Sequence, residues 1–364
     1  MPTGKTRQAV IIGVGAVGCR LAADIRGQLG GHRYLFIDTD GYSLGAYPQE
    51  EALVIGEAET DSRGTGKRPE MARRAAAGAE AEIKEAIGEA DVAVVVASFG
   101  GGTGAGAGPL VSRFARELGA TSIIVALDPF AFESSAKVKQ ACEALLSAGN
   151  QPEAVVRIPC TLLPGTGSDD RSFKEALAAA EEHASEAVAA LVHIAANPGM
   201  LGVDFGDLRR VLCEPGGAVI GVGRAEGERR VEEAIRQACN SSFLDAHRLH
   251  AAANVMLHVA GDEMLSLREV EEGAHAINAI SRGDYLLSVD VRPGLGDEVV
   301  VTVLLSGFSA EIDDAATAPE HEAAPPPGAF VYEGVNIDVP TFLRRERSTF
   351  FRPGRLSSSY HFGR

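Results

Sequence analysis

The sequence predicts an α/β protein in which a parallel-sheet domain is joined by a long central helix to a smaller α+β domain, with a disordered linker and tail after it. Short apolar strands alternate with helical segments over residues 8–158, the pattern of a parallel sheet with helices on both faces. Residues 169–195 form one long helical run, which the Asn-Pro-Gly sequence at 197–199 ends. Strands predominate over residues 216–308, which is typical of a smaller α+β domain.

A glycine-rich segment follows the most apolar strand. Residues 92–97 are apolar and mostly β-branched, so they fit a strand buried on both faces, and six glycines then occur from Gly100 to Gly108. We expect the next helix to begin near Leu110. Backbone N–H groups in a glycine loop, the positive end of a helix dipole and the Thr103 hydroxyl together suit a polyphosphate. The segment therefore predicts a phosphate site, and the alternative is a flexible turn.

A second glycine loop lies near the N-terminus. A strand at residues 8–12 leads into residues 13–18, which match GxGxxG; a helix is expected from Arg20, and Asp38 ends the next strand. Alone, this pattern predicts a Rossmann oxidoreductase that binds a nicotinamide dinucleotide. That fold gives no role to the loop at residues 100–106. Two glycine loops after neighbouring strands predict instead one nucleotide whose phosphates are held from both sides.

Two further patterns, a P-loop-like lysine and a pair of histidines, do not predict a functional site. Lys67 follows Gly66, but the surrounding residues do not complete GxxxxGK[ST], which excludes a P-loop NTPase. His247 and His250 share a helical face without other ligands nearby in the sequence, so a core or surface role is favoured over a metal site. The sequence thus predicts no metal centre.

The composition narrows the possible functions. A net charge of −16 argues against binding to nucleic acid or anionic membranes, and 5% aromatic residues leave little for base stacking. Five scattered cysteines without a CxxC pair predict neither a disulfide framework nor a zinc site. No apolar run approaches the length of a membrane span. We therefore expect a soluble, cytoplasmic protein that is not inserted into a membrane.

Two carboxylates, Asp204 and Asp207, follow the central helix. One interpretation is an N-cap with an acidic first turn for the short helix that comes next, and the other is a pair of functional carboxylates. The residues alone leave both open.

The C-terminal part has two compositions. Residues 309–334 hold six acids, no Lys or Arg and three consecutive prolines, so they are expected to be an unfolded linker. From Arg344 onward there are six arginines against one glutamate, preceded by apolar residues. This combination predicts a basic tail, residues 335–364, that folds on a partner.

At residues 100–106 the chain resembles the tubulin superfamily, whose signature is GGGTG[ST]G, and within it the FtsZ family of bacterial cell-division GTPases, as a divergent member. The resemblance extends over nearly the whole chain. Its further motifs are IGVG at 12–15, Thr39-Asp40, Pro69-Glu70, PFxFE at 129–133, VDFxD at 203–207, the AxxGxGxAxGE run that starts at Ala218, and DVPTFLRR at 338–345.

The resemblance implies that GTP or GDP binds between the two glycine loops, with Mg²⁺ as a candidate companion ion. The nucleotide-binding residues that it implies are Gly13, Gly15, Ala16, Val17, Gly18, Cys19, Arg20, Asp38, Gly100, Gly101, Gly102, Thr103, Gly104, Ala105, Gly106, Glu133, Lys137 and Glu182.

The resemblance also implies self-assembly into a head-to-tail homopolymer. The loop with Asp204 and Asp207 would enter the next subunit's site and orient water against the γ-phosphate, so hydrolysis would require assembly. The tail would dock on membrane tethers or division regulators at the division site. Its implied contacts are Ile337, Asp338, Val339, Pro340, Phe342, Leu343 and Arg344.

The predicted domains are residues 1–195 for nucleotide binding, including the central helix, 196–308 for the α+β domain, 309–334 for the linker and 335–364 for the tail. Several implied contact positions depart from the family pattern; Cys19, Lys137, Glu182 and Gly202 are examples. Two functions therefore stay open. One is an assembly-dependent GTPase of cell division, and the other is a paralogue that assembles but hydrolyses GTP weakly or not at all.

Overall fold

The computed structural model divides the chain into two units, residues 1–315 and 316–364, which are described separately. The described residues are 7–129, 133–134, 137, 139–141, 143–144, 154–158, 172–197, 201, 203, 205–214, 217–239, 252–280, 284–292, 294–308, 331–332 and 335–336.

The first unit is built on one ten-stranded sheet with the order β3-β2-β1-β4-β5-β6-β7-β10-β8-β9. The six strands from β3 to β6 in this order pair in parallel, and outside the edge strand β3 most of their residues are buried. This confirms the predicted parallel sheet. The strands are β1 (Ala9–Val14), β2 (Arg33–Asp38), β3 (Ala52–Val54), β4 (Val92–Ser98), β5 (Thr121–Leu127) and β6 (Ala154–Ile158).

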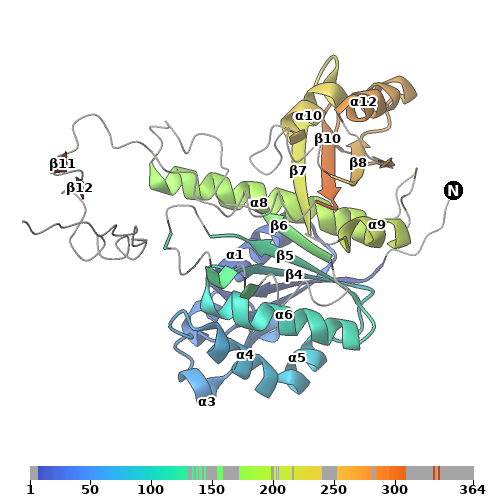
Figure 1. Ribbon diagram of the computed structural model, residues 1–364. Coiled ribbons are helices and arrows are strands. Elements are labelled where there is room, and N and C mark those ends of the chain that lie inside the picture. Colours follow the sequence, from blue (N-terminus) through green and yellow to red (C-terminus); the bar gives the residue numbers. More distant parts are fainter. Residues whose placement is uncertain are drawn as a thin grey trace, which may run out of the picture. The chain divides into compact units, whose positions relative to one another are not determined.

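Helices cover both faces of these parallel strands (Figure 1). Alternate residues of β1 belong to two different cores: Ile11 packs with α1 and the central helix, whereas Val10 and Ile12 pack with α4, α5 and α6. The helices of this domain are α1 (Gly15–Gln28), α2 (Gly41–Leu44), η1 (Gln49–Glu51), α3 (Glu57–Thr60), α4 (Pro69–Gly78), α5 (Glu80–Ile87) and α6 (Gly102–Glu117).

Two helices begin earlier than the sequence predicted. We expected α1 from Arg20 and α6 from about Leu110, but α1 begins at Gly15 and α6 at Gly102, so most of the second glycine run is helical. The prediction that this run is a loop was wrong because it attributed the absence of side chains to the close approach of a ligand. The protein's own backbone packing requires many of these glycines: a Cβ atom on Gly104 would lie less than 3.0 Å from the Ser98 carbonyl oxygen.

The remaining strands form a smaller α+β region, as predicted. β10 lies between β7 and β8 and is antiparallel to both, while β8 and β9 are parallel. β7 joins β6 through two parallel residue pairs, so both regions share one sheet. The elements are α9 (Phe205–Leu212), β7 (Ala218–Ala225), α10 (Arg230–Cys239), β8 (Asn254–Gly261), α12 (Leu267–Ile280), β9 (Asp284–Val291) and β10 (Val299–Ser306).

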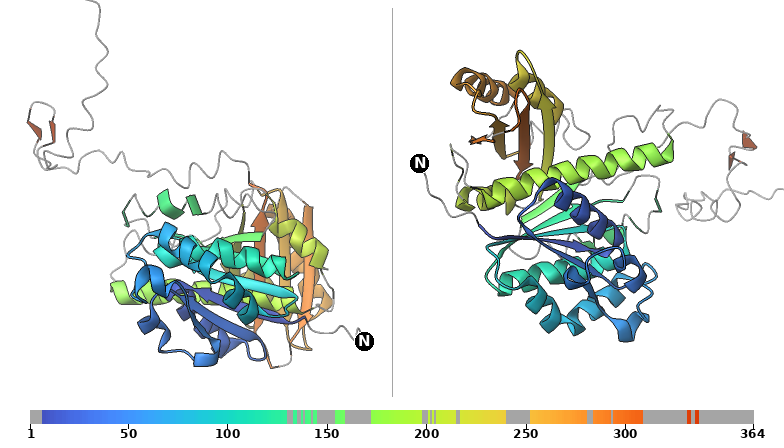
Figure 2. Two further views of the ribbon diagram at one scale, coloured as in Figure 1. Left: turned by 90° about the horizontal axis from the view of Figure 1, so that it is seen from below. Right: turned by 180° about the vertical axis from the view of Figure 1, so that it is seen from behind.

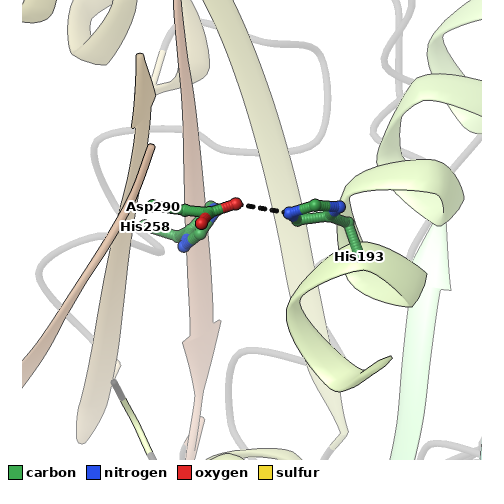
Figure 3. Close-up of side chains that lie close together, drawn as sticks. All are labelled: His193, His258 and Asp290. Atoms are coloured by element: carbon green, nitrogen blue, oxygen red, sulfur yellow. Dashed lines mark hydrogen bonds and ion pairs between the residues drawn. The ribbon is translucent and has the colours of Figure 1, made fainter. Parts of the chain in front are cut away.

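The predicted central helix is α8 (Phe173–Ala196), which lies between the parallel strands and the strands β7–β10 (Figure 2). Ser172 and Glu175 form a capping box that fixes its start, and Asn197 ends it. α8 packs on α1, β4 and β7. Near its other end, His193 donates to Asp290 of β9 (Figure 3).

The outer edge of β9 is bridged by a residue that follows α8. Leu201 and Val289 exchange two backbone hydrogen bonds, of 3.1 and 3.0 Å, in an isolated antiparallel bridge. The segment that leads to α9 is therefore attached to the sheet.

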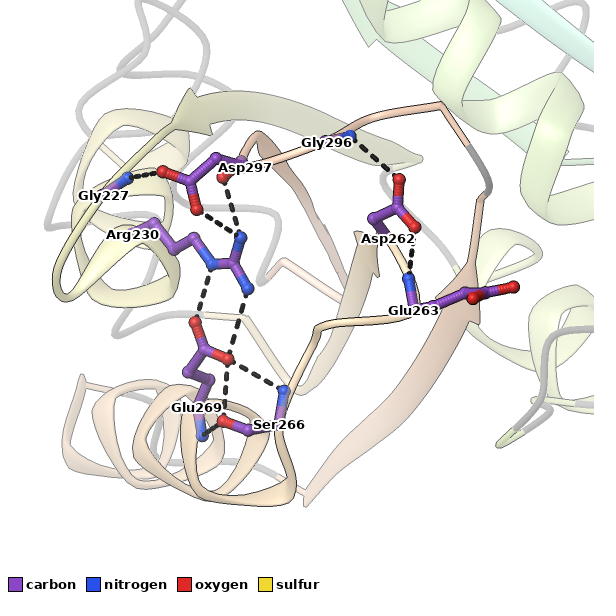
Figure 4. Close-up of polar contacts among 8 residues, drawn as sticks. All are labelled: Gly227, Arg230, Asp262, Glu263, Ser266, Glu269, Gly296 and Asp297. Atoms are coloured by element: carbon purple, nitrogen blue, oxygen red, sulfur yellow. Dashed lines mark hydrogen bonds and ion pairs between the residues drawn. The ribbon is translucent and has the colours of Figure 1, made fainter.

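Buried and partly buried charges hold the loops of the α+β region (Figure 4). Arg230 is only 5% exposed, and its guanidinium donates to Glu269 at 2.7 Å and to the carboxylate of Asp297 at 3.0 Å. Asp262 accepts from the backbone N–H groups of Gly294 and Gly296. These contacts join α10 and α12 to the turn before β10, and the Arg230 hydrogen bond lowers the pKa of Glu269 to about 2.

The second unit is described only at β11 (Val331–Tyr332) and β12 (Val335–Asn336), which pair antiparallel. The predicted boundary between linker and tail thus falls inside this hairpin. Among the described residues of the whole chain, no helix is long and apolar enough to cross a membrane.

We predict that Gly106→Ala lowers the free energy of unfolding by about 1–3 kcal/mol, because the new methyl group would overlap the Pro69 carbonyl oxygen. Gly27→Ala in α1 is the matched control. Its methyl group would meet nothing within 4 Å, so this variant should gain about 0.5–1 kcal/mol. Urea unfolding followed by circular dichroism measures both changes. Equal effects of the two variants would contradict the packing argument.

Candidate nucleotide site

The N-termini of α1 and α6 meet at the carboxyl edge of the parallel strands. α1 follows β1, α6 follows β4 after a short turn, and these two strands are neighbours in the sheet. A Cβ atom on Gly15 would lie 3.2 Å from the backbone nitrogen of Gly104 and 3.3 Å from Cβ of Thr103. Gly15 also has a φ of +76°, which favours glycine. The two glycine segments that the sequence singled out therefore touch each other.

Neither of these helix N-termini is capped by a side chain. Val14 precedes α1 and Gly101 precedes α6; neither provides a capping hydrogen bond, and neither first turn contains an acid. The first N–H groups of a helix lack intrahelical acceptors and carry the positive end of the dipole. Two such ends side by side suit an anion with several oxygens.

The turn after β2 is bonded to the start of α6. The hydroxyl oxygens of Thr39 and Thr103 lie 2.9 Å apart, and both residues are buried. The carboxylate of Asp38 accepts from the backbone N–H of Thr39 at 2.7 Å and from the Ser43 hydroxyl at 2.8 Å. Asp38 thus holds this turn through hydrogen bonds within the protein.

The loop at residues 61–68 lies against the start of α6. A Cβ atom on Gly102 would be 2.9 Å from the backbone nitrogen of Arg68 and 3.0 Å from Cα of Lys67. Both cations are exposed and lie beside the positive end of a helix, an arrangement that an anion would stabilise. Five residues of the loop have positive φ: Asp61, Ser62, Gly64, Gly66 and Lys67.

The sequence patterns do not predict Lys67 and Arg68 as site residues. The only motif that Lys67 fits is an incomplete P-loop. The available signal was the alternation of glycines with Thr65 and the two cations just before the helix that starts at Pro69.

Three of the predicted charged contacts, Arg20, Lys137 and Glu133, have partners within the protein. Arg20 of α1 donates to Glu181 of α8 at 2.5 Å, next to Glu182, which is exposed. Lys137 forms an ion pair with Glu133. The structure therefore brings α1 close to the central helix but pairs Lys137 and Glu133 with each other.

The other predicted contacts lie in the two glycine segments. Gly13 ends β1 together with Val14, and Ala16, Val17 and Gly18 are in the first turns of α1, where Ala16 is exposed. Burial raises the pKa of the Cys19 thiol far above its usual value, so only its backbone is suited to a ligand. Gly100 and Gly101 form the turn before α6, and Gly102, Thr103, Gly104, Ala105 and Gly106 begin the helix.

Only one of the two predicted catalytic carboxylates, Asp207, lies among the residues that the structure describes. Asp207 is half-buried in the first turn of α9, where the helix dipole favours an acid. Asp204 lies outside the described residues, and so do all the implied tail contacts from Ile337 to Arg344.

Two protein-family models match most of this chain. The family model described as "Tubulin/FtsZ family, GTPase domain" matches residues 8–163, and that described as "FtsZ family, C-terminal domain" matches residues 216–309. The two models together cover more than half of the chain.

Solved structures agree with these matches. An empty FtsZ dimer from M. jannaschii is 27% identical with a TM-score of 0.75, and the match covers 83% of this chain and 89% of that chain. CetZ2 from Haloferax volcanii, solved as a GTPγS-bound protofilament, is 22% identical with a TM-score of 0.71, covering 85% of this chain and 96% of that chain. The CetZ2 likeness concerns the fold alone. With both family models matched in order, the chain belongs to the tubulin/FtsZ family.

Proposed function

We propose that this protein is a cytoskeletal GTPase that binds GTP or GDP, assembles head to tail with copies of itself and hydrolyses GTP at the subunit interface. Its family supports the first part, since the matched N-terminal domain is a GTPase domain. The FtsZ dimer and the CetZ2 protofilament are relatives that associate, which supports self-assembly as a hypothesis.

One observation carries the proposal: the uncapped N-termini of α1 and α6 touch at the edge of the sheet. A Rossmann oxidoreductase places the pyrophosphate of its dinucleotide on one such helix end, whereas a nucleoside di- or triphosphate has a free terminal phosphate that can reach the second. Asp38, which the oxidoreductase hypothesis needs for a ribose, is buried and accepts hydrogen bonds from Thr39 and Ser43.

Two cations complete the proposed phosphate site. Lys67 and Arg68 lie against the first residue of α6, so their side chains would neutralise the terminal phosphates. Mg²⁺ in such sites is held mostly by phosphates and water, and we propose that it enters with the nucleotide. We place the base near Glu182, because Arg20 and Glu181 hold α1 against that part of α8.

Catalysis is proposed to come from the neighbouring subunit. Asp204 and Asp207 would orient water against the γ-phosphate bound by the next copy. The tail residues 337–344 would dock on a membrane tether or a division regulator. A role in cell division is part of this proposal and rests on the family resemblance of the tail.

The alternative is a paralogue that assembles and hydrolyses GTP weakly or not at all. The ion pair between Lys137 and Glu133 favours it, because both side chains would have to leave each other to contact the nucleotide. Light scattering and phosphate release with GTP separate the two functions: assembly without phosphate release would select the paralogue. Tight binding of a nicotinamide dinucleotide without GTP binding would contradict both.

We predict that Gly101→Asp weakens GTP binding at least about tenfold, or about 1.4 kcal/mol, although it stabilises the unliganded protein. Gly101 has the extended conformation of an N-cap, and its Cβ position is open, with the Ser98 carbonyl oxygen 3.7 Å away. Aspartate would cap α6, and its negative charge would repel the phosphates. Calorimetric titration with GTP and thermal unfolding of the unliganded protein measure the two effects.

Gly101→Asn is the matched control, because asparagine caps a helix about as well as aspartate but carries no charge. Its loss of affinity should be clearly smaller. If Gly101→Asp binds GTP as tightly as the unchanged protein, the phosphates do not lie at this helix end.

We predict that Asp207→Asn binds GTP normally and assembles, while GTP turnover falls about 100-fold or more, since the carboxylate acts in the neighbouring subunit's site. Turnover should partly return on mixing with Gly101→Asp, because one subunit then supplies an intact pocket and the other an intact acidic loop. If Asp207 is only a first-turn acid, Asp207→Asn should lose stability without a selective loss of turnover, and mixing should restore nothing.

A further inference from the structure

Three potential metal ligands converge from separate elements of the fold. His193 lies on α8, His258 on β8 and Asp290 on β9, and one ligand atom of each lies within 4.8 Å of the other two (Figure 3). His258 is buried and the other two are half-buried. Two imidazoles and a carboxylate form a donor set typical of Zn²⁺, with water as the fourth ligand.

The hydrogen bonds around the cluster define its protonation. His193 Nε2 donates to Asp290 at 2.6 Å, and the Asn197 amide donates to His193 Nδ1 at 3.2 Å. His258 Nδ1 donates to the Ser288 hydroxyl at 3.1 Å, which leaves its Nε2 as an acceptor. Each imidazole thus has one ring nitrogen that accepts a hydrogen bond, and such a nitrogen is the kind that binds a metal.

Electrostatics agree with this assignment. Burial, with a smaller contribution from Arg292, lowers the pKa of His258 to about 3. The hydrogen bond from His193 lowers the pKa of Asp290 to about 2. The Ser288 hydroxyl further fixes the His258 ring, as outer partners of metal-binding histidines commonly do.

Arg292 supplies the positive charge that this cluster needs. Its Nε donates to Asp290 at 3.1 Å and its Nη2 donates to His258 Nε2 at 3.3 Å, so it contacts two of the three ligands. Its side chain is 25% exposed and therefore has a route to solvent. A bound divalent cation would replace Arg292 as the positively charged partner of Asp290.

We propose that His193, His258 and Asp290 form a binding site for a transition metal ion of the Zn²⁺ type, and that the ion displaces the guanidinium of Arg292. The His193 proton moves from Nε2 to Nδ1 on binding, which frees Nε2 for the ion. The Asn197 amide rotates so that its oxygen accepts this proton, and it gives up its hydrogen bonds to His193 Nδ1 and to the His193 carbonyl oxygen. His193 and Asp290 separate slightly to admit the ion. The metal would link the end of α8 to β8 and β9.

The test uses the untagged full-length chain, stripped of metal with a chelator and dialysed. Titration with Zn²⁺ by calorimetry should give one site per chain, and Co²⁺ should give a tetrahedral absorption spectrum without a thiolate charge-transfer band. His193→Gln and His258→Gln should each weaken binding at least about tenfold. His275→Gln, which changes an exposed histidine of α12, is the control and should bind like the unchanged protein.

Arg292→Gln gives the sharpest result, because removing the competing cation should strengthen Zn²⁺ binding several-fold. Circular dichroism in the presence of chelator checks that each variant folds. If His258→Gln does not fold, the binding measurements on His193→Gln and Arg292→Gln test the proposed metal site. The proposal is overturned if the unchanged protein binds no stoichiometric Zn²⁺, if His193→Gln binds as tightly, or if Arg292→Gln binds no better. None of these measurements depends on GTP.

Discussion

Close backbone packing at the carboxyl edge of the parallel sheet is the constraint on which the rest of this structure depends. Gly18 lies against the Val96 carbonyl, Gly104 against that of Ser98 and Gly106 against that of Pro69, each nearer than any side chain would allow. These contacts set α1 and α6 directly on β4, and α6 on the start of α4. The anion site is thus a consequence of helix packing: the glycines let the two helices approach, and Val14 and Gly101 at the capping positions leave the N-termini uncapped.

The central helix is held unequally along its length. Towards its N-terminal half, Arg20 and Glu181 form a largely exposed pair, and such pairs contribute little to stability. Its second half is buried from Ala184 to Ala196 apart from a few positions, and there His193 bonds a half-buried carboxylate. The end next to the β8–β9 strands is therefore the firmly fixed one, and the end near the glycine segments is the freer one.

Much of the fold could be predicted from the sequence, because β-branched runs such as that of β4 and the capped Ala-rich run of α8 carry strong local signals. The start of α6 could not be predicted, because glycine has poor helix propensity. Tertiary contacts with Ser98 and Pro69 favour the helical conformation of this segment. Within the candidate site, the glycines and Thr103 were recognised from their pattern. Lys67 and Arg68 were not, because their place beside α6 arises from a loop with unusual backbone angles. The cluster around His258 has no sequence signature, since β8, β9 and α8 bring it together only in space.

The bridge between Leu201 and Val289 also bears on how the molecule avoids aggregation. A sheet is most vulnerable where an outermost strand offers free backbone groups to another chain. Here one outermost strand, β3, has three residues, and the other, β9, is paired with Leu201 at Val289. Both margins of the sheet therefore offer few consecutive free backbone groups to a strand of another chain.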